Sequence, residues 1–153
     1  MRLLLFIVLL SVISMSGQSF AQDDYKEVNP NNLSEILQPT TGQKRVLLVY
    51  ASWCPHCQTI FPKLIDIEKD YPGSVQAISM DKDIDRFKEF TKQFPNLRID
   101  PLIWNKEFHL GISLGELGVN FPGFIPFIAL IDKDRKTVKQ GYLTVDEIKN
   151  FLQ

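Results

Sequence analysis

An apolar, β-prone run at residues 46–50 leads into the only two cysteines of the chain, and a segment with helical spacing follows them. The cysteines stand in the sequence Trp53-Cys54-Pro55-His56-Cys57. This pattern predicts a strand, a tight turn and a helix, with Cys54 at the first turn of the helix. The apolar residues that recur along one face of that helix are Ile60, Leu64, Ile67 and Tyr71.

Cys54 is expected to be the reactive thiol. At a helix N-terminus, unpaired backbone N–H groups and the helix dipole favour a thiolate over a thiol. Cys57 lies one helical turn further on and is expected to be buried, as the resolving thiol that breaks a mixed disulfide. Pro55 suits the first helical turn, because its missing N–H would have no partner there. A positive charge on His56 would lower the pKa of the Cys54 thiol further and make the disulfide more oxidising.

Other uses of the cysteine pair fit the sequence less well. A tetrahedral zinc site needs four ligands, and beyond the cysteines the chain offers only His56 and His109. Covalent haem attachment needs a histidine directly after the second cysteine, where Gln58 stands. A structural disulfide that closes so short a loop would constrain little of the unfolded chain. We therefore predict a redox-active Cys54–Cys57 disulfide, with no metal and no other cofactor.

The N-terminus has the features of an export signal. Arg2 precedes an apolar run, and Ser19-Phe20-Ala21 supplies small residues at the two positions that a signal peptidase requires. The run is shorter than a membrane-spanning helix, which needs about 20 apolar residues. We expect a signal peptide over residues 1–21, cleaved after Ala21, and export to the bacterial periplasm. An uncleaved N-terminal anchor is the alternative.

Composition restricts the partners. The formal net charge is −1 and no basic stripe or charge block occurs, so nucleic acid is not an expected partner. Two cysteines in an exported protein do not make a disulfide-stapled scaffold, which leaves the pair free for exchange. The expected partners are protein thiols and disulfides and a membrane redox protein that recycles the pair. The expected state is a monomer.

Strands and helices are expected to alternate along the rest of the chain. Residues 22–32 are polar and are expected to be a flexible lead, followed by one folded domain over residues 33–153. Asp83 suits a helix N-cap, and Thr144 with Glu147 suits a capping box. Pro101 is expected to move its short strand to a sheet edge. Helices are expected at 33–37, 55–70, 83–94 and 144–152, and strands at 46–50, 75–80, 99–104, 127–131 and 137–140.

This α/β pattern resembles the thioredoxin superfamily from about residue 33 to residue 153. Trp53-Cys54-Pro55-His56-Cys57 occupies the place of the family's redox motif, with Pro62 at the place of its helix proline. Gly123-Phe124-Ile125-Pro126-Phe127 looks like its cis-proline loop. The resemblance implies a thioredoxin-like fold, with a central mixed β-sheet flanked by helices. It also implies that Ile125 and a cis Pro126 bind an extended substrate strand, and that Trp53 covers the disulfide beside that groove.

Two features resemble different branches of the superfamily. Pro126 follows Cys57 by 69 residues, and the surplus over plain thioredoxin is expected to be a helix and a strand at 83–104, before the cis-proline loop. This insert resembles that of TlpA-type exported proteins, which are mostly reductases serving cytochrome c maturation and related thiol repair. The Pro-His dipeptide instead resembles the oxidant DsbA, whose large helical insert has no room here.

One departure from the family pattern concerns proton transfer. Many members carry a buried acid six residues before the first cysteine, thought to shuttle protons to the second. Leu48 stands at that position here, and Ala77 replaces the partner lysine on the next strand. Conventional proton transfer to Cys57 is therefore not expected, and water entering beside the motif could serve instead.

The sequence thus predicts an exported thiol–disulfide oxidoreductase that acts on protein substrates through Cys54 and Cys57, with a TlpA-like reductase favoured. Two alternatives remain, a DsbA-like oxidant of exported proteins and a non-catalytic thioredoxin-like binding module. The direction of electron flow depends on the reduction potential of the pair and on the upstream redox partner.

Overall fold

The apolar run before the cysteines forms β2 (Arg45–Tyr50), a strand with all of its residues buried. In the sheet order β1-β4-β3-β2-β5-β6, β2 pairs in parallel with β3 (Val75–Ser79) and antiparallel with β5 (Phe127–Ile131). The sheet is therefore mixed, as expected. The computed structural model describes residues 24–37 and 42–153. The signal peptide expected over residues 1–21 lies outside these described residues.

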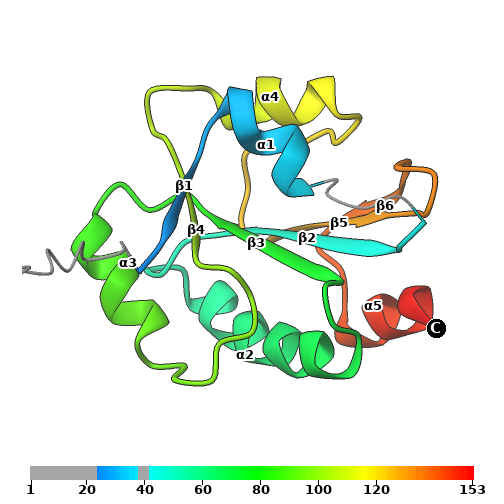
Figure 1. The fold of residues 1–153 in the computed structure, drawn as a ribbon, viewed down its shortest axis with the longest axis horizontal. Coiled ribbons are helices and arrows are strands. Elements are labelled where there is room, and N and C mark those ends of the chain that lie inside the picture. The colour runs from blue at the N-terminus through cyan, green and yellow to red at the C-terminus, as the bar shows by residue number, and fades with distance from the viewer. Residues whose placement is uncertain (1–23, 38–41) are drawn as a thin grey trace, which may run out of the picture.

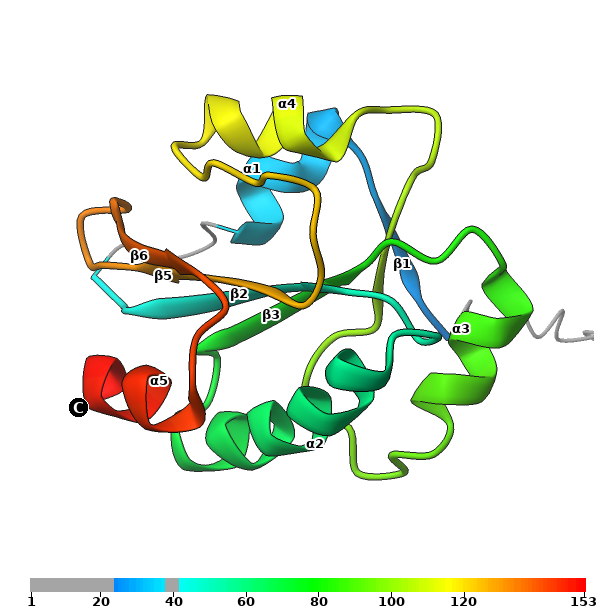
Figure 2. The ribbon, with the colours of Figure 1, turned by 180° about the vertical axis from the view of Figure 1, so that it is seen from behind.

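Helices cover both faces of the sheet (Figure 1, Figure 2). One face is covered by α1 (Pro30–Leu37) and α4 (Leu110–Glu116), and the other by α2 (Pro55–Asp70), α3 (Ile84–Thr91) and α5 (Val145–Leu152). Each face has its own hydrophobic core. Side chains of a strand point alternately to the two faces, so the residues of β2 divide between the cores. Leu47 and Val49 belong to the α1 side, and Val46, Leu48 and Tyr50 to the α2 side.

Local sequence signals set the start of two helices. Asp83 caps α3 by accepting hydrogen bonds from the backbone N–H groups of Asp85 and Arg86, at 3.0 and 3.2 Å. Thr144 and Glu147 form the expected capping box at the start of α5. Both caps supply acceptors for N–H groups that the first turn of a helix leaves unpaired.

The segment expected to be a flexible lead contains a strand instead. Residues 26–28 form β1 (Lys26–Val28), and α1 begins at Pro30 rather than at residue 33. β1 pairs in parallel with β4 (Leu102–Trp104), and Val28 is fully buried. Three residues are too few to show the alternation by which a strand is recognised in a sequence. Pairing with a distant segment is what makes these residues a strand.

Pro101 does not place its strand at the sheet edge, which corrects the expectation. β4 begins one residue after Pro101 and lies between β1 and β3. Pro101 has no N–H to donate, but its carbonyl oxygen accepts a hydrogen bond from the Lys26 N–H at 2.9 Å. The proline therefore sits at the strand's start without interrupting the ladder. The two edges are β1 and β6 (Thr137–Gly141).

α3 and β4 form the expected insert between α2, the helix that carries Cys57, and the cis-proline loop. Phe87 and Phe90 of α3 join the core on the α2 face. Ile84 precedes Phe87 by three residues, a spacing typical of one helix face, but it is exposed at the start of the helix. β4 extends the sheet beyond β3, so the insert adds one strand to the interior of the sheet.

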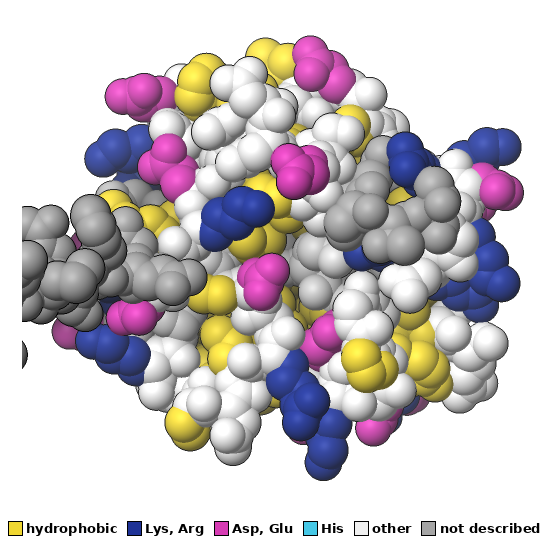
Figure 3. All heavy atoms as spheres, viewed as in Figure 1, with side chains coloured by type: hydrophobic (Ala, Val, Ile, Leu, Met, Phe, Trp, Pro, Cys, Tyr) yellow, Lys and Arg dark blue, Asp and Glu magenta, His cyan; other side chains and the backbone are white. Residues whose placement is uncertain are grey.

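The surface has a mixed character. On the face shown in Figure 3, acidic and basic side chains are interspersed, and neither sign forms a continuous patch. Several large hydrophobic side chains are exposed, among them Trp53, Phe108 and Phe124. Within residues 24–37 and 42–153, no helix is long and apolar enough to cross a membrane.

Candidate active site

Cys54 and Cys57 lie where the chain leaves β2 and enters α2. Cys54 is the N-cap residue of α2, and Pro55 is the first residue of the helix. The two cysteines form a disulfide, and their Cα atoms are 5.1 Å apart. The Cys57 N–H donates a hydrogen bond to Cys54 Sγ at 3.2 Å. In the reduced protein this N–H and the positive end of the helix dipole favour a thiolate at Cys54.

The two sulfur-bearing side chains differ in their access to solvent. The exposed fraction of Cys54 is 5 %, and that of Cys57 is 0 %. Pro55 and His56 are exposed on the first turn of α2, and Trp53 is 54 % exposed just before it. An incoming thiol or disulfide therefore reaches Cys54 first, and Trp53 is a surface residue rather than part of the hydrophobic core.

The loop before β5 lies at the same end of the central strands as the cysteines, where β2 ends and β5 begins. The Ile125–Pro126 peptide bond is cis, as the family resemblance implied. Val49, near the end of β2, pairs with Phe127, the first residue of β5. β2 ends where its antiparallel neighbour β5 begins. The turn at residues 51–54, here called the redox turn, therefore adjoins the cis-proline loop. Pro126 is buried, and the half-buried Ile125 packs against both cores.

A hydrogen-bond network holds Ser52, two residues before Cys54. Asp81 accepts hydrogen bonds from the Ser52 N–H at 2.9 Å and from the Ser52 hydroxyl at 2.7 Å. Asp81 also accepts from the Ser79 hydroxyl at 2.5 Å. The side-chain amide of Gln58 donates to the Ser52 carbonyl oxygen at 2.7 Å. Ser52, Ser79 and Asp81 are buried, so water does not compete for these bonds.

Sequence reasoning did not identify this network. Ser52 follows β2 and Asp81 follows β3, and the parallel pairing of the two strands brings their ends together. The signal that could have found it is an acid and a serine at corresponding ends of two parallel strands.

The network also has an electrostatic effect. Burial, and to a lesser extent the nearby Asp81 carboxylate, raises the pKa of the Tyr50 phenol well above its ordinary value.

The part of the sheet next to the cysteines is apolar. Leu48 and Ala77 are direct partners in the β2–β3 register. Both belong to the buried cluster that also contains Cys57. The two positions at which the family pattern has an acid and a lysine thus adjoin each other, and neither carries a titratable side chain here.

The second histidine lies away from this site. His109 is the exposed N-cap residue of α4, on the other face of the sheet, and its side chain makes no capping hydrogen bond. In the described part of the chain, no three His, Cys, Asp or Glu side chains are grouped so that they could hold a metal ion. The residues that the structure does bring together, Cys54, Cys57 and the Ile125–Pro126 loop, suit dithiol–disulfide exchange.

Comparison with known proteins identifies the family. The model of the Thioredoxin family matches residues 24–100, about half of the chain, and this range includes the cysteine pair. The chain belongs to the thioredoxin family. Protein disulfide isomerase-like 1-1 of Arabidopsis thaliana is 28 % identical over 135 residues, which cover 83 % of this chain. The chain spans only 25 % of that relative's length.

Solved structures share the fold. The exposed lipoprotein thioredoxin Etrx1 of Streptococcus pneumoniae strain TIGR4 has a TM-score of 0.58 and 26 % identity, over 76 % of this chain and 87 % of its own. A thioredoxin-family thiol:disulfide interchange protein of Chlorobium tepidum TLS has a TM-score of 0.60 and 16 % identity, over 73 % and 79 %. A secreted Mycobacterium tuberculosis disulfide oxidoreductase, homologous to E. coli DsbE, has a TM-score of 0.56 and 18 % identity, over 73 % and 81 %. The thioredoxin-like fold expected from the sequence is confirmed.

Proposed function

We propose that this protein is an exported thiol–disulfide oxidoreductase that reduces disulfides of protein substrates, in the manner of TlpA-like proteins. One observation carries the proposal: Cys54 caps α2 and accepts a hydrogen bond from the Cys57 N–H, beside the Ile125–Pro126 loop. A sulfur favoured as a thiolate and a place for an extended chain are thus at one edge of the sheet.

The proposed reaction has two exchanges. The Cys54 thiolate attacks one sulfur of a substrate disulfide, the substrate S–S bond breaks, and the other substrate sulfur leaves as a thiolate. Cys57 then attacks Cys54 Sγ, the mixed disulfide breaks, and the Cys57 proton ends on the departing substrate sulfur. Two electrons pass to the substrate, and the protein is left with the Cys54–Cys57 disulfide. A membrane redox partner carrying a dithiol is proposed to reduce it again.

Residues around the pair have supporting roles in this proposal. Ile125 and Pro126 receive the substrate as an added strand, because an extended chain can pair with exposed backbone groups at a strand end. The exposed ring of Trp53 borders that groove. Pro55 starts the helix without leaving an N–H unpaired. His56 adjusts the stability of the Cys54 thiolate through its charge.

The direction of the reaction rests on two features. The α3–β4 insert supports the reductase, because it matches the extra helix and strand by which the sequence resembles TlpA-like proteins. The exposed His56 supports the second candidate, a DsbA-like oxidant, because a positive charge near Cys54 stabilises the reduced form and raises the potential. Export, with cleavage after Ala21, is part of the proposal and is supported by the pattern of residues 1–21. The monomeric state is also proposed.

The variant Cys57→Ala tests the exchange mechanism. Its mixed disulfides have no internal thiol to resolve them, so substrate proteins should accumulate as covalent adducts through Cys54. The double variant Cys54→Ala/Cys57→Ala is the matched control and should form none. Adducts with cytochrome c maturation proteins support the reductase, and a broad set of newly exported proteins supports the oxidant. A folded Cys57→Ala protein without adducts contradicts the mechanism and favours the binding module.

A further inference from the structure

A cavity of about 310 Å³ opens at the carboxyl ends of the parallel strands, the end of the sheet at which the cysteines also lie. Its walls come from the ends of β3 and β4, the start of α4 and residues 121–123. The ends of parallel strands meet at one edge of a sheet, and β2 also ends there. The volume suits one or two amino-acid side chains and is at the lower end for small-ligand pockets.

Two connections join the cavity to the redox turn. Met80, which lines the cavity, donates its N–H to the Tyr50 carbonyl oxygen at 2.7 Å, and the next residue, Asp81, holds Ser52. On the other side, the loop that joins α4 to β5 (Figure 2) lines the cavity at 121–123, and Pro126 is its last residue. From residue 121 to residue 126 this loop advances five residues, which span at most about 18 Å when extended. A substrate chain lying along it reaches both places.

The cavity has a positive rim. Lys82 and Lys106 line it, and His109 stands beside them, whereas no Asp or Glu belongs to its lining. Within residues 24–37 and 42–153, neither lysine ammonium has a hydrogen-bond or ion-pair partner. Lys82 and Lys106 also line a smaller neighbouring cavity, whose lining includes the carboxylates of Glu27, Asp81 and Glu107. The charged side chains that line the larger cavity are thus all basic, and among the described residues neither lysine forms an ion pair.

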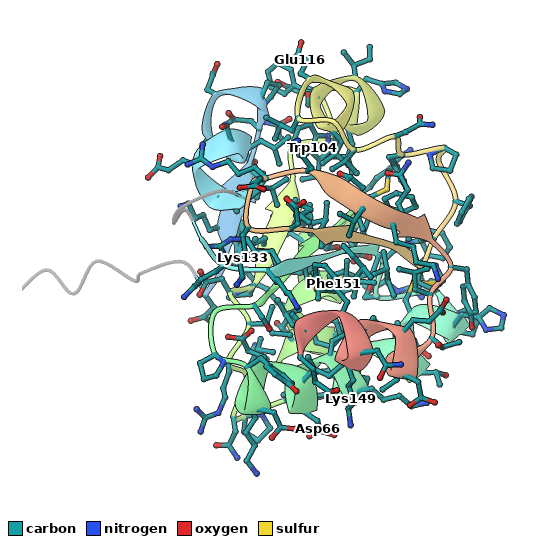
Figure 4. All side chains as sticks on the ribbon, turned by 90° about the vertical axis from the view of Figure 1, so that its right-hand side faces the viewer. Asp66, Trp104, Glu116, Lys133, Lys149 and Phe151 are labelled. Carbon is teal, nitrogen blue, oxygen red and sulfur yellow. A yellow bond between two sulfur atoms is a disulfide. The ribbon has the colours of Figure 1, made fainter. Side chains whose placement is uncertain are left out.

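The interior of the cavity is apolar. Trp104 is the last residue of β4, and its side chain lies between the sheet and α4 (Figure 4). Trp104 is 5 % exposed. Its indole N–H donates to the Phe108 carbonyl oxygen at 2.9 Å, so its polar atom is satisfied and the ring is left for apolar contact. Gly111 allows the walls to approach closely: a Cβ there would meet His109 Cε1 at 3.2 Å and the Phe121 carbonyl oxygen at 3.3 Å.

We propose that this cavity is a second substrate subsite, which binds an apolar side chain with a neighbouring carboxylate on the protein whose disulfide Cys54 attacks. The inference rests on the proposed function and adds its substrate class. The apolar interior takes the hydrophobic side chain, and Lys82 and Lys106 take the carboxylate. Substrates with an acidic residue about three to five positions from the reactive cysteine are therefore preferred.

The test uses peptides that carry one cysteine joined to a neutral thiopyridyl group. One set places Leu-Asp about three to five residues from the cysteine, on either side, and the matched set places Leu-Lys there. Reduced protein releases thiopyridone when Cys54 attacks the peptide sulfur, and Cys57 then frees the peptide thiol. We expect the second-order rate constant of thiopyridone release to be on the order of fivefold higher for the best acidic peptide than for its lysine counterpart. The ratio should approach one at about 1 M salt.

In the double variant Lys82→Gln/Lys106→Gln, the ratio of the rate with the acidic peptide to the rate with its lysine counterpart should be close to one at low salt. Each rate is divided by the same variant's rate with an uncharged thiopyridyl disulfide, and circular dichroism checks folding. Lys133→Gln/Lys136→Gln is the matched control, because it removes two charges from the β5–β6 turn at the opposite end of β5 (Figure 4). It should keep the wild-type ratio.

A wild-type ratio of one, or a preference that survives in Lys82→Gln/Lys106→Gln, overturns the subsite alone. A folded, reduced wild-type protein that does not react with the uncharged disulfide overturns the proposed function and the subsite with it.

Discussion

Ser52 is the residue through which the sheet holds the redox turn. Each of its polar groups has a partner, because Asp81 accepts from its N–H and hydroxyl and Gln58 donates to its carbonyl oxygen. Asp81 is buried, and a buried donor left without an acceptor costs about 1–3 kcal/mol. We therefore expect Asp81 to position Cys54 through Ser52.

Asp81→Asn should lower the free energy of unfolding by about 1–3 kcal/mol, because an amide NH2 replaces one acceptor oxygen. It should also shift the pH midpoint of Cys54 alkylation in the reduced protein, since the turn that sets the thiolate environment is no longer fixed. Urea unfolding and iodoacetamide rates measure the two effects. Asp83→Asn, which keeps a helix-capping side chain, should change little. A stability loss with an unchanged alkylation midpoint shows that Asp81 has a structural role only.

His56→Pro should make the reduction potential of the pair more negative. His56 is exposed two residues after the N-cap Cys54, and loss of a positive neighbour destabilises the Cys54 thiolate, hence the reduced form. Each 1.4 kcal/mol of this effect corresponds to about 30 mV. Equilibration with glutathione measures the potential. Lys63→Gln, which removes an exposed cation two turns further along α2, should shift it less. If His56→Pro has the wild-type potential, His56 is an ordinary surface residue.

At the scale of elements, α2 rests on an aromatic cluster. The ring centroid of Phe61 lies 4.8 Å from that of Tyr50, 5.1 Å from that of Phe90 and 5.2 Å from that of Phe94. Phe61 is 1 % exposed. The cluster joins the redox helix to β2 and to the α3 insert.

Phe61→Ala should lower the free energy of unfolding by about 3–5 kcal/mol, since it leaves a cavity under α2. Denaturant unfolding measures the loss. Ile112→Ala, at a position that is 65 % exposed, should change stability by less than about 0.5 kcal/mol. Equal effects of the two substitutions would mean that this cluster does not hold the helix.

The capping box of α5 is charged. Glu147 accepts from Lys139 at 2.6 Å and from the Thr144 N–H and hydroxyl at 2.8 and 2.9 Å. The Lys139 bond first, and the Thr144 bonds next, lower the pKa of Glu147 from 4.5 to about 2. Since the folded-state pKa is the lower one, the carboxylate stabilises the fold above pH 4.5.

That contribution should be lost as the pH falls from 4.5 towards about 2. In Glu147→Gln, the dependence of unfolding free energy on pH in this window should therefore be weaker than in the wild type. Urea unfolding at several acidic pH values measures it. The effect is small because the pair is at the surface. Asp146→Asn is the neighbouring control and should keep more of the wild-type slope. Identical slopes in wild type and Glu147→Gln would contradict the assignment.

At the scale of the whole molecule, what could be predicted depended on distance along the chain. The strand, turn and helix around Cys54 follow from adjacent residues, and the resemblance supplied the cis Pro126. The strand β1, the interior place of β4 and the Ser52–Asp81 pair could not be predicted. Each depends on which distant strands pair, and a local pattern of hydrophobicity does not encode that pairing. The exposed Ile84 shows that helical spacing alone does not determine which residues of a helix face are buried.

The apolar pair Leu48 and Ala77 has a consequence for the electrochemistry of the cysteines. Reducing a disulfide to two thiols consumes two electrons and two protons, so the potential falls by about 59 mV per pH unit, and by about 30 mV once one thiol is ionised. A buried acid whose pKa changed on reduction would add a further break to that line. Leu48→Asp should introduce such a break below neutral pH, and glutathione equilibration across pH measures it. Parallel lines for variant and wild type would contradict this expectation. Without an internal acid beneath Cys57, the driving force of the couple follows the acidity of the surrounding compartment directly.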